Sequence, residues 1–367
     1  MANLFHQKFA QTVVQYSLNL QPGDILLIRT TTLAVPLVQE VYREALRAGA
    51  NVITRLTFDR AEEIFAEEAS DEQLQWISEG DIQDAQSITA RLVISAPFNT
   101  RAGKTISNDR MALRAKVMQS VGAIQSKRTM QNEMRWCGTL FPTHALAQEA
   151  EMNLPEYEQF VYRAMFLDRD DPIAAWKEFS VDQQKKVDQL NQVGELRFIA
   201  EDTDFKCNVA GRKWMNSDGK RNFPSGEVFT GPIEDSASGH VRFSFPSLRN
   251  GKEISDVRLK FDKGRVVSAT AASNQVALLA ELDYDDGARL LGEIAIGNNY
   301  GVQRYTRNTL FDEKIGGTFH MAVGSSYPET GGVNTSSIHW DLVCDLRSGG
   351  EIYADNKLIH KDGQWVI

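Results

Sequence analysis

The chain has 367 residues, 42% of them hydrophobic and 24% charged, and it carries a formal net charge of -9 at pH 7. This composition is typical of globular proteins and excludes the disordered, collagen-like and disulfide-scaffold classes, while the length favours two domains. The acidic balance, with no basic stretch interleaved with aromatic residues, argues against nucleic acid as a partner.

The N-terminal segment and the cysteines predict where the protein is found. Residues 1–20 mix polar with apolar positions, unlike a signal peptide, and no apolar run is long enough to indicate a membrane span. Cys137, Cys207 and Cys344 are widely spaced and predict reduced thiols, because neither a disulfide framework nor a thiolate zinc site is indicated. We therefore expect a cytoplasmic protein that binds no membrane.

The first half of the chain alternates strand and helix patterns. An apolar strand pattern at 25–28 is followed by a helix with apolar residues at helical spacing over 35–45 and a stop at Gly49. Further strand patterns lie at 51–58 and 91–96. This order predicts an α/β domain with a mostly parallel sheet. No glycine-rich loop follows the first strand, so a dinucleotide-binding fingerprint is absent.

A helical pattern over residues 143–194 leads into the second half of the chain. We place the domain boundary near residue 190, where the helical pattern gives way to short alternating segments. The prediction is an α/β domain over residues 1–190 and an α+β domain over residues 191–367 that carries the candidate site.

The second domain consists of short alternating segments separated by turn signals, which predict antiparallel hairpins. The turn signals are Ser217-Asp218-Gly219, Asp262-Lys263-Gly264, Asp355-Asn356 and Asp362-Gly363. One helix is predicted over 273–284, where Val276, Leu279 and Ala280 have helical spacing.

His339 and Asp341 alternate with apolar residues in a predicted strand over 337–344. Because strand side chains alternate between two faces, the imidazole and the carboxylate project from the same face. Both groups bind zinc, cobalt or manganese, so the pair could form half of a metal site. For such a pair alone, a solvated hydrogen-bonded pair is the preferred interpretation.

Three more ionisable residues, Glu227, Glu293 and His320, interrupt apolar strand patterns in the same domain. An unpaired carboxylate is costly to bury there, and a shared divalent cation would compensate both its charge and its lost hydration. Each residue taken singly is more often salt-bridged or a satisfied core group. Taken together, the pattern leaves a metal site and ordinary buried pairs about equally supported.

At this point the sequence resembles a known family, the thermophilic metalloproteases of the aminopeptidase T and aminopeptidase S group. The shared motifs occur in the same order: FPSGEVFTGP at 223–232, LGEIA at 291–295, TLFDE at 309–313, HMAVG at 320–324, YPETGG at 327–332 and IHWD at 338–341. LQPGD at 20–24 and RWCGTLFPT at 135–143 extend the resemblance over nearly the whole chain.

The resemblance implies a homodimer with two divalent ions, which would be zinc, cobalt, manganese or magnesium. The implied ligands are Glu227, Glu293, Glu313, His320, His339 and Asp341. Glu293 is the expected bridge between the ions, and Tyr327 is expected beside them. Gly316-Gly317 lengthens the spacing from Glu313 to His320 relative to some members, so Glu313 could also be a general base or a partner of a ligand.

The expected function is that of a metalloaminopeptidase, which releases N-terminal amino acids from peptides through a water activated by two metal ions. Glu293 or Glu313 would accept the proton of this water, and Tyr327 would donate a hydrogen bond to the oxyanion. Neither an HExxH nor a GxSxG motif is present. Two alternatives stay open: another two-metal hydrolase, such as an amidase or phosphoesterase, and a non-catalytic relative that binds metal or peptide.

Overall fold

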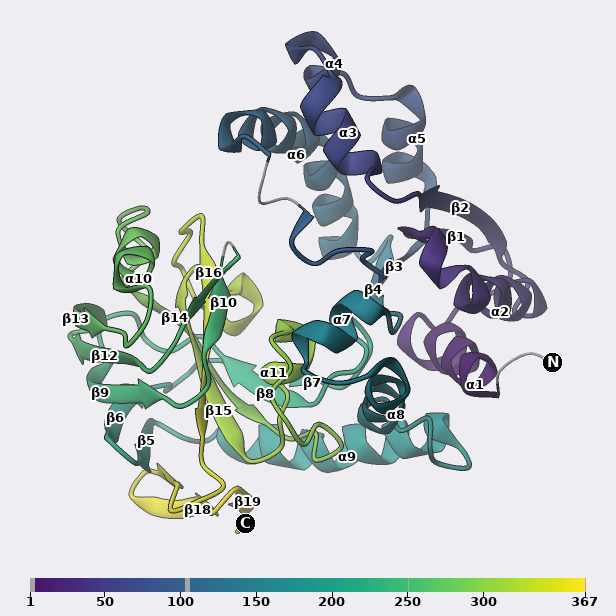
Figure 1. The fold of residues 1–367 in the computed structure, drawn as a ribbon. Helices are drawn as coiled ribbons and strands as arrows, with labels where there is room; N and C mark the ends of the chain where they lie inside the picture. Colours follow the sequence, from purple (N-terminus) through teal and green to yellow (C-terminus); the bar gives the residue numbers. More distant parts are fainter. Residues whose placement is uncertain (1–3, 103–105, 250, 367) are drawn as a thin grey trace. The chain divides into compact units, whose positions relative to one another are not determined.

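A computed structural model describes residues 4–102, 106–249 and 251–366, whose helices and strands are drawn in Figure 1. The chain divides into two compact units. The first comprises Met1–Ala175 and Gly219–Phe223, and the second comprises Trp176–Asp218 and Pro224–Ile367. The assignment of independent domains with a boundary near residue 190 stays a prediction.

The first unit contains a four-stranded parallel sheet in the order β2-β1-β3-β4. Its strands are β1 (Ile25–Thr31), β2 (Asn51–Thr57), β3 (Ala90–Ser95) and β4 (Arg135–Leu140). Its α-helices are α1 (Leu4–Thr12), α2 (Val35–Arg47), α3 (Ala61–Glu68), α4 (Asp71–Gln75), α5 (Glu79–Ser87), α6 (Asn108–Met130), α7 (His144–Glu149) and α8 (Leu154–Ala164). The prediction of a mostly parallel sheet is confirmed, and α6 and β4 add to the elements that the sequence predicted.

Helix α2 follows from its sequence pattern. Leu37, Val38, Val41 and Ala45 recur at helical spacing and are buried. Gly49, with a φ of 82°, adopts the left-handed conformation beyond the helix end, which favours glycine. Strand β2 then pairs in parallel with β1, as the βαβ pattern predicted.

The second unit contains an eight-stranded sheet, a five-stranded sheet and a two-stranded hairpin. Their strand orders are β13-β12-β9-β6-β5-β17-β18-β19, β16-β15-β14-β8-β7 and β10-β11. The strands are β5 (Glu195–Ala200), β6 (Thr203–Asn208), β7 (Met215–Ser217), β8 (Glu227–Thr230), β9 (Ser238–Phe243), β10 (Ser247–Arg249), β11 (Lys252–Ile254), β12 (Val257–Asp262), β13 (Arg265–Thr270), β14 (Leu291–Gly297), β15 (Thr318–Gly324), β16 (His339–Asp345), β17 (Glu351–Ala354), β18 (Lys357–Lys361) and β19 (Gln364–Trp365).

The strand pairs of these sheets are antiparallel, which confirms the predicted α+β character of the second half. The α-helices that accompany the sheets are α9 (Pro172–Leu190), α10 (Gln275–Leu282) and α11 (Thr309–Asp312). Helix α9 begins just before the second unit and continues into it.

All four predicted turn signals lie in connections between neighbouring antiparallel strands. Asp262-Lys263-Gly264 joins β12 to β13, and the two Asp-containing turns near the C-terminus join β17 to β18 and β18 to β19. Ser217-Asp218-Gly219 begins the connection from β7 to its antiparallel neighbour β8, which is longer than the other three and covers residues 218–226. Residues 219–223 belong to the first unit, where the N–H of Phe223 donates to the Gly138 carbonyl at 2.8 Å.

Helix α10 lies where the sequence predicted a helix, and only part of its apolar surface is buried. Leu278 and Leu282 are fully buried, whereas Val276 is 82% exposed. Both leucines join the hydrophobic core of the second unit, and Ala277 packs against it. The predicted helix is therefore confirmed, and its tertiary contacts determine which of its apolar side chains are buried.

The eight-stranded and five-stranded sheets share one hydrophobic core. Phe198 of β5 packs against Phe319 of β15 with ring centroids 4.5 Å apart, and Val187 and Leu190 of α9 join the same core. Burial of each such large side chain stabilises the fold by on the order of 1.5–3 kcal/mol. One face of the five-stranded sheet packs into this core. We call the opposite face its outer face.

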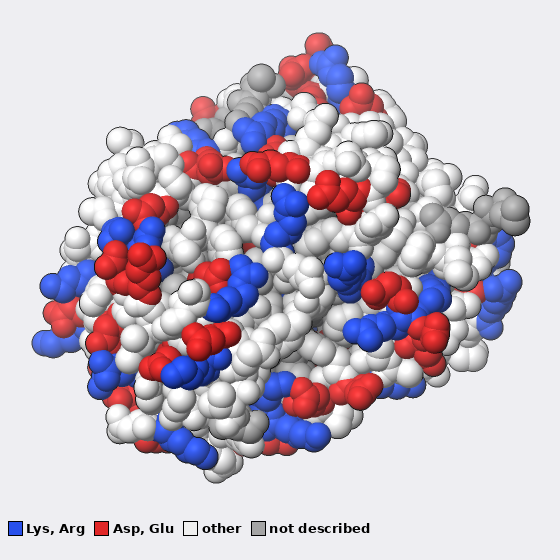
Figure 2. Space-filling view, turned by 60° about the horizontal axis from the view of Figure 1, so that its bottom comes forward, with Lys and Arg blue, Asp and Glu red and all other residues white. Residues whose placement is uncertain are grey.

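The described residues include no helix that is both long enough and apolar enough to cross a membrane. On the face of the molecule in Figure 2, acidic and basic side chains are interspersed. Many charged residues are paired in the structure, for example Arg197 with Asp204 at 2.7 Å and Arg242 with Asp256 at 2.6 Å. Among its described residues, the face in view has no extended basic surface of the kind that binds nucleic acid.

Candidate metal centre

The outer face of the five-stranded sheet carries the candidate site. In β15, Phe319, Met321 and Val323 belong to the core, while His320 and Ala322 alternate with them and lie on the outer face. Every residue of β15 is buried, so the outer face is covered as well. A polar side chain placed on this face is therefore separated from solvent and needs a partner within the protein.

A β-bulge turns Glu293 onto the outer face. In a regular strand Leu291 and Glu293 would share a face, and Leu291 belongs to the core. The register of β14 against β15 shifts between these two residues, so that they lie on opposite faces. Gly292 stands at the shift, where an added Cβ would lie 2.3 Å from the carbonyl oxygen of Gly324. Only glycine fits this close approach of two backbones.

Strands β16 and β8 add three more ionisable residues to the outer face. In β16, Trp340 and Leu342 belong to the core, and His339 and Asp341 alternate with them. This alternation confirms that His339 and Asp341 share a face, as their spacing predicted. In β8, Glu227 precedes a core valine and therefore lies on the outer face as well.

Alanines separate the ionisable residues across the strands. Ala322 pairs with Glu293 on one side and with Asp341 on the other, and Ala295 pairs with His320. An alanine side chain ends at Cβ, so the longer carboxylates and the imidazole can lean over it. The sheet register therefore allows polar atoms from three strands to meet above small residues.

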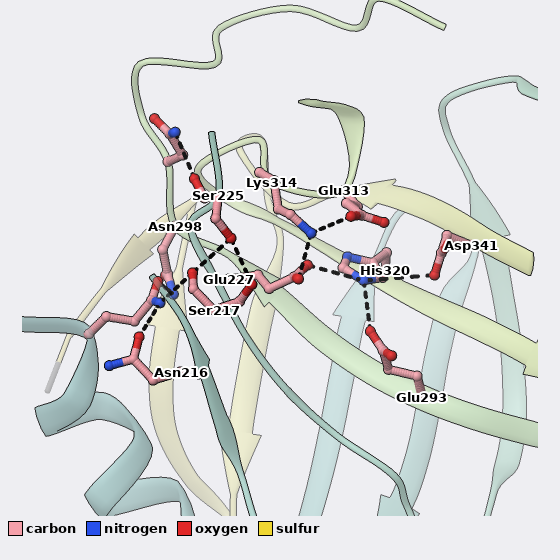
Figure 3. A network of polar contacts seen from close by, with 12 residues as sticks. Asn216, Ser217, Ser225, Glu227, Glu293, Asn298, Glu313, Lys314, His320 and Asp341 are labelled. Atoms are coloured by element: carbon pink, nitrogen blue, oxygen red, sulfur yellow. Dashed lines mark hydrogen bonds and ion pairs between the residues drawn. The ribbon is translucent and has the colours of Figure 1, made fainter. Parts of the chain in front are cut away.

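The ligand atoms of six residues converge in this way, and Figure 3 shows five of them. In each of three groups, the ligand atoms lie within 4.8 Å of one another. The groups are Glu227 with Glu293 and His320, Glu293 with His339 and Asp341, and Glu313 with His320 and Asp341. Because the groups share members, they form one continuous centre.

His320 lies in the middle of this centre. Its Nε2 atom lies 3.2 Å from Oε1 of Glu293, 3.5 Å from Oε2 of Glu227 and 4.0 Å from Oδ1 of Asp341. Nε2 of His339 lies 3.4 Å from Oδ1 of Asp341 and 3.6 Å from Oε2 of Glu293. Both imidazoles thus face carboxylate oxygens of the outer face.

Four buried polar atoms of the centre have no hydrogen-bond partner among the described residues. They are Oε2 of Glu227, Oε2 of Glu293, Nδ1 of His320 and Oδ1 of Asp341. An unsatisfied buried group costs about 1–3 kcal/mol, and more when it is charged. Carboxylate oxygens and imidazole nitrogens are ligands of divalent metal ions, which would compensate this cost. The residues present therefore fit a divalent-metal centre.

Ser325 determines which nitrogen of His339 can bind a metal ion. Nδ1 of His339 lies 2.8 Å from the carbonyl oxygen of Ser325. A carbonyl oxygen only accepts hydrogen bonds, so Nδ1 is the donor. In the neutral ring, the lone pair is then on Nε2, the atom that faces Glu293 and Asp341. A backbone carbonyl that orients a histidine in this way is a common feature of metal sites.

Glu313 reaches the centre from outside the sheet, directly after α11. The next residue, Lys314, is 1% exposed. Its Nζ atom donates to Oε1 of Glu227, 2.5 Å away, and to Oε1 of Glu313. A buried lysine therefore lies inside the cluster of carboxylates, where it pairs with two of the predicted ligands (Figure 3).

Burial and neighbouring charges shift the pKa values of the centre in opposite directions. Burial alone lowers the pKa of both histidines, but the surrounding carboxylates outweigh it and raise the pKa of His320 to about 9 and that of His339 to about 10. Burial raises the pKa of Asp341, but the charge of His339 outweighs it and lowers the pKa to about 2. Without metal ions, both histidines are therefore protonated and positively charged at neutral pH.

The structure places all the predicted site residues in or beside the centre. Tyr327, which is not a member of the three groups, packs edge-on against His339 with ring centroids 5.2 Å apart. Lys314 is the one residue of the cluster in Figure 3 that pairs with predicted ligands and that the sequence did not predict. No pattern distinguishes it, because lysine is almost always exposed in folded proteins.

Buried carboxylates and imidazoles that converge on one sheet face are typical of metal-dependent hydrolases. A profile of the thermophilic metalloprotease family (M29) matches residues 5–365. Aminopeptidase 2 of Geobacillus stearothermophilus is 31% identical, with 98% of this chain and 97% of that protein covered. Aminopeptidase T of Thermus thermophilus is 27% identical, with 98% of each covered. The chain therefore belongs to the thermophilic metalloprotease family, as its motifs predicted.

The fold is that of a solved relative. The structure of wild-type AmpT from Thermus thermophilus has a TM-score of 0.86 to this chain, at 24% identity and with 99% of each chain covered. Membership of the family confirms the predicted class of enzyme, a metalloaminopeptidase, which is a hydrolase that acts on peptide bonds. It also implies a divalent metal cofactor.

Proposed function

We propose that the protein releases N-terminal amino acids from peptides and uses divalent metal ions held by the centre. The proposed ligands are Glu227, Glu293, Glu313, His320, His339 and Asp341. The observation that carries the proposal is the set of buried carboxylate and imidazole atoms without hydrogen-bond partners. Two ion positions are proposed, and Glu293 would contribute to both, because its Oε1 faces His320 and its Oε2 faces His339.

When bound, such ions polarise the scissile carbonyl group and lower the pKa of the attacking water molecule. The protein holds the ligands ready for this chemistry. The register of β14, β15 and β16 sets the positions of Glu293, His320 and Asp341, and the Ser325 carbonyl sets the orientation of His339. Ligands held by a rigid sheet need little rearrangement during the reaction.

We assign proton transfer to Glu313 and bridging to Glu293. Glu313 belongs to a single ligand group, and a cavity of about 30 Å³ lies beside it and Asp341, which is room for about one water molecule. Burial raises the pKa of Glu313, although the ammonium group of Lys314 opposes the shift. A carboxylate with a pKa raised toward neutrality can accept a proton from water and return it to the leaving amine.

Tyr327 is the proposed donor to the oxyanion. Its ring packs against His339 and against Phe229, with centroids 5.2 and 5.4 Å apart. Burial and the charge of Glu293 raise its pKa, so the hydroxyl group keeps its proton at neutral pH. A neutral phenol placed beside the metal ligands can donate a hydrogen bond to the negative oxygen that develops in the transition state.

The first test is the hydrolysis of leucyl and other aminoacyl anilides by the purified protein. We expect hydrolysis that is abolished by a chelator and restored by cobalt or zinc. The matched control substrate is the N-acetylated leucyl anilide, which lacks the free α-amine and should not be cleaved. Inactivity on the anilides combined with cleavage of a phosphoester would establish a different metallohydrolase. Metal binding without turnover of either substrate would favour the non-catalytic alternative.

A homodimer and a cytoplasmic location belong to the same proposal, and both rest on the sequence. Light scattering coupled to size-exclusion chromatography tests the first, with a dimer as the expected result. A monomer at all concentrations would contradict it.

A further inference from the structure

One end of the metal centre contains an internal cation. Nζ of Lys314 donates hydrogen bonds to one carboxylate oxygen each of Glu227 and Glu313. The Lys314 side chain is 1% exposed, so these carboxylates, and not solvent, balance its charge. Figure 3 shows the ammonium group between them. We call these three residues the lysine end of the centre.

The other end is formed by Glu293, His339 and Asp341, and we call it the histidine end. Oε2 of Glu293 and Oδ1 of Asp341 are buried and have no hydrogen-bond partner among the described residues. They lie 3.6 and 3.4 Å from Nε2 of His339, the ring atom that the Ser325 contact leaves available. In the described part of the chain, no lysine or arginine forms an ion pair with either carboxylate.

We infer that Lys314 competes with a divalent ion for the carboxylates of the lysine end, so that the centre has one strong ion position, at the histidine end, and one weak position. This inference rests on the proposed metal centre and goes beyond it, because it makes the two positions unequal. It also assigns a function to the one buried lysine of the cluster.

Two physical arguments support the inequality. A divalent ion at the lysine end must bind oxygen atoms that the ammonium group already contacts, and like charges at such distances repel strongly away from water. The four carboxylates and the ammonium group together carry three negative charges, with the histidines neutral. One divalent ion leaves a single negative charge, which suits the α-ammonium group of a peptide, whereas a second ion reverses the sign of the centre.

The experiment counts metal ions in the full chain. The protein is loaded with zinc, passed through a desalting column and analysed for metal per chain, and calorimetric titration with zinc gives the affinities. For the wild type we expect one retained ion and a second that binds on the order of 100-fold more weakly or worse. In Lys314→Met, which keeps an unbranched side chain of similar length without its charge, we expect two retained ions.

Lys361→Met is the matched control, because Lys361 is exposed and pairs with Glu351 at 3.2 Å on strands of the eight-stranded sheet, whereas the centre lies on the five-stranded sheet. We expect this variant to bind zinc as the wild type does. Two ions of equal affinity in the wild type would overturn the inference, as would a weak second ion that Lys314→Met leaves unchanged.

A second measurement keeps the inference testable if Lys314→Met does not fold. Anomalous diffraction from wild-type crystals grown at low and at high zinc concentration locates each ion directly. Zinc at the histidine end alone at the low concentration supports the inference, and zinc at the lysine end at that concentration overturns it.

Failure of the inference and failure of the proposed function are distinguishable. A chain that retains one ion but hydrolyses no aminoacyl anilide would overturn the proposed function and leave the assignment of Lys314 in place. A chain that hydrolyses the anilides with two equally bound ions would overturn the assignment of Lys314 alone.

Discussion

Nε2 of His320 lies 3.2 Å from Oε1 of Glu293, and both side chains are almost fully buried. The contact joins two neighbouring strands of the five-stranded sheet, and each of the two residues belongs to two of the three ligand groups. Loss of either side chain therefore affects more than one group of ligands. Glu293 supplies negative charge to both of its ligand groups, so its carboxylate is the first target for mutation.

Glu293→Gln preserves the shape of the side chain and removes its charge. We expect kcat/KM for a leucyl anilide to fall by about 100-fold or more, with less metal retained per chain, because an amide is a much poorer ligand for a divalent ion than a carboxylate. Glu351→Gln, on β17 and away from the centre, is the control and should behave as the wild type. Wild-type turnover in Glu293→Gln would rule out the role proposed for this residue.

Removal of metal should destabilise the second unit. In the metal-free chain, Oε2 of Glu227, Oε2 of Glu293 and Oδ1 of Asp341 are buried without a hydrogen-bond partner among the described residues, and an unsatisfied buried charged group is costly. An ion that binds only the folded chain stabilises it by about 2.7 kcal/mol when present at 100 times its dissociation constant. We expect the midpoint of thermal unfolding to fall in the presence of EDTA and to recover when zinc is added in excess. The same unfolding curve with EDTA and with zinc would contradict the binding of a metal ion that stabilises the folded chain.

Metal uptake should release protons. Because the pKa of His320 is raised to about 9 and that of His339 to about 10, both rings carry a proton at pH 7 in the metal-free chain. A raised pKa keeps the proton bound until the pH passes that value, so metal affinity should rise with pH and level off above about pH 10.

Calorimetric titrations with zinc at pH 7 in two buffers of different ionisation enthalpy measure the protons released. We expect at least one proton per chain, and fewer in His339→Gln, which has no imidazole to deprotonate. An identical binding enthalpy in both buffers would show that the histidines are already neutral.

Gly292→Ala tests the β-bulge that turns the side chain of Glu293 onto the outer face. An added Cβ would lie 2.3 Å from the Gly324 carbonyl oxygen and 2.4 Å from that of Ser325, the group that orients His339. We expect a loss of about 1–3 kcal/mol in the free energy of unfolding, together with weaker metal retention. Denaturant unfolding and metal analysis measure the two effects.

Gly122→Ala is the control for the bulge variant. Gly122 lies inside α6, and a Cβ added there meets no atom within 4 Å. Because alanine favours a helix over glycine by about 0.5–1 kcal/mol, this variant should be as stable as the wild type or more so. If Gly292→Ala were equally harmless, the backbone at the bulge would have to be free to move.

His360 makes the fold sensitive to acid. Its side chain is fully buried on β18, both ring nitrogens lack a hydrogen-bond partner among the described residues, and burial lowers its pKa from 6.5 to about 4. In the unfolded chain this histidine takes up a proton below pH 6.5, whereas in the folded chain it does so only near pH 4. The free energy of unfolding should therefore fall between these pH values, by at most about 1.4 kcal/mol per pH unit from this residue.

His360→Phe removes the titration and keeps an aromatic ring against Trp365, whose ring lies 5.5 Å away in an edge-on arrangement. We expect a shallower loss of stability between pH 6.5 and 4 than in the wild type. His144→Phe, at an exposed position, should leave the slope unchanged. Urea unfolding at several pH values gives the slopes, and equal slopes for wild type and His360→Phe would contradict the assignment.

Local patterns were sufficient to predict most of the fold. The apolar spacing over 35–45 and the strand patterns on either side determine a βαβ unit, because a helix and two parallel strands bury matching faces. The alternation around His339 and Asp341 fixes a shared face in the same way. Such predictions depend only on the period of side chains along one element.

Other features depend on contacts between elements and were not predictable. By strict alternation Glu293 would share the core face with Leu291, and only the register shift against β15 turns it outward. Lys314 is a site residue because two carboxylates from elsewhere in the chain surround it. The buried stripe of α10 is likewise chosen by the sheet on which the helix packs.

The path of the chain between β7 and β8 has a consequence for how this protein can be divided. Residues 219–223 leave the second unit and add to the first, where Asn222 pairs with Gly138 of β4. The backbone therefore passes between the units at three places in the sequence, not at one. A fragment that ends at residue 175 lacks the piece that completes its own sheet edge. A single recombination junction likewise cannot exchange one unit for that of a relative, since part of each is encoded within the span of the other.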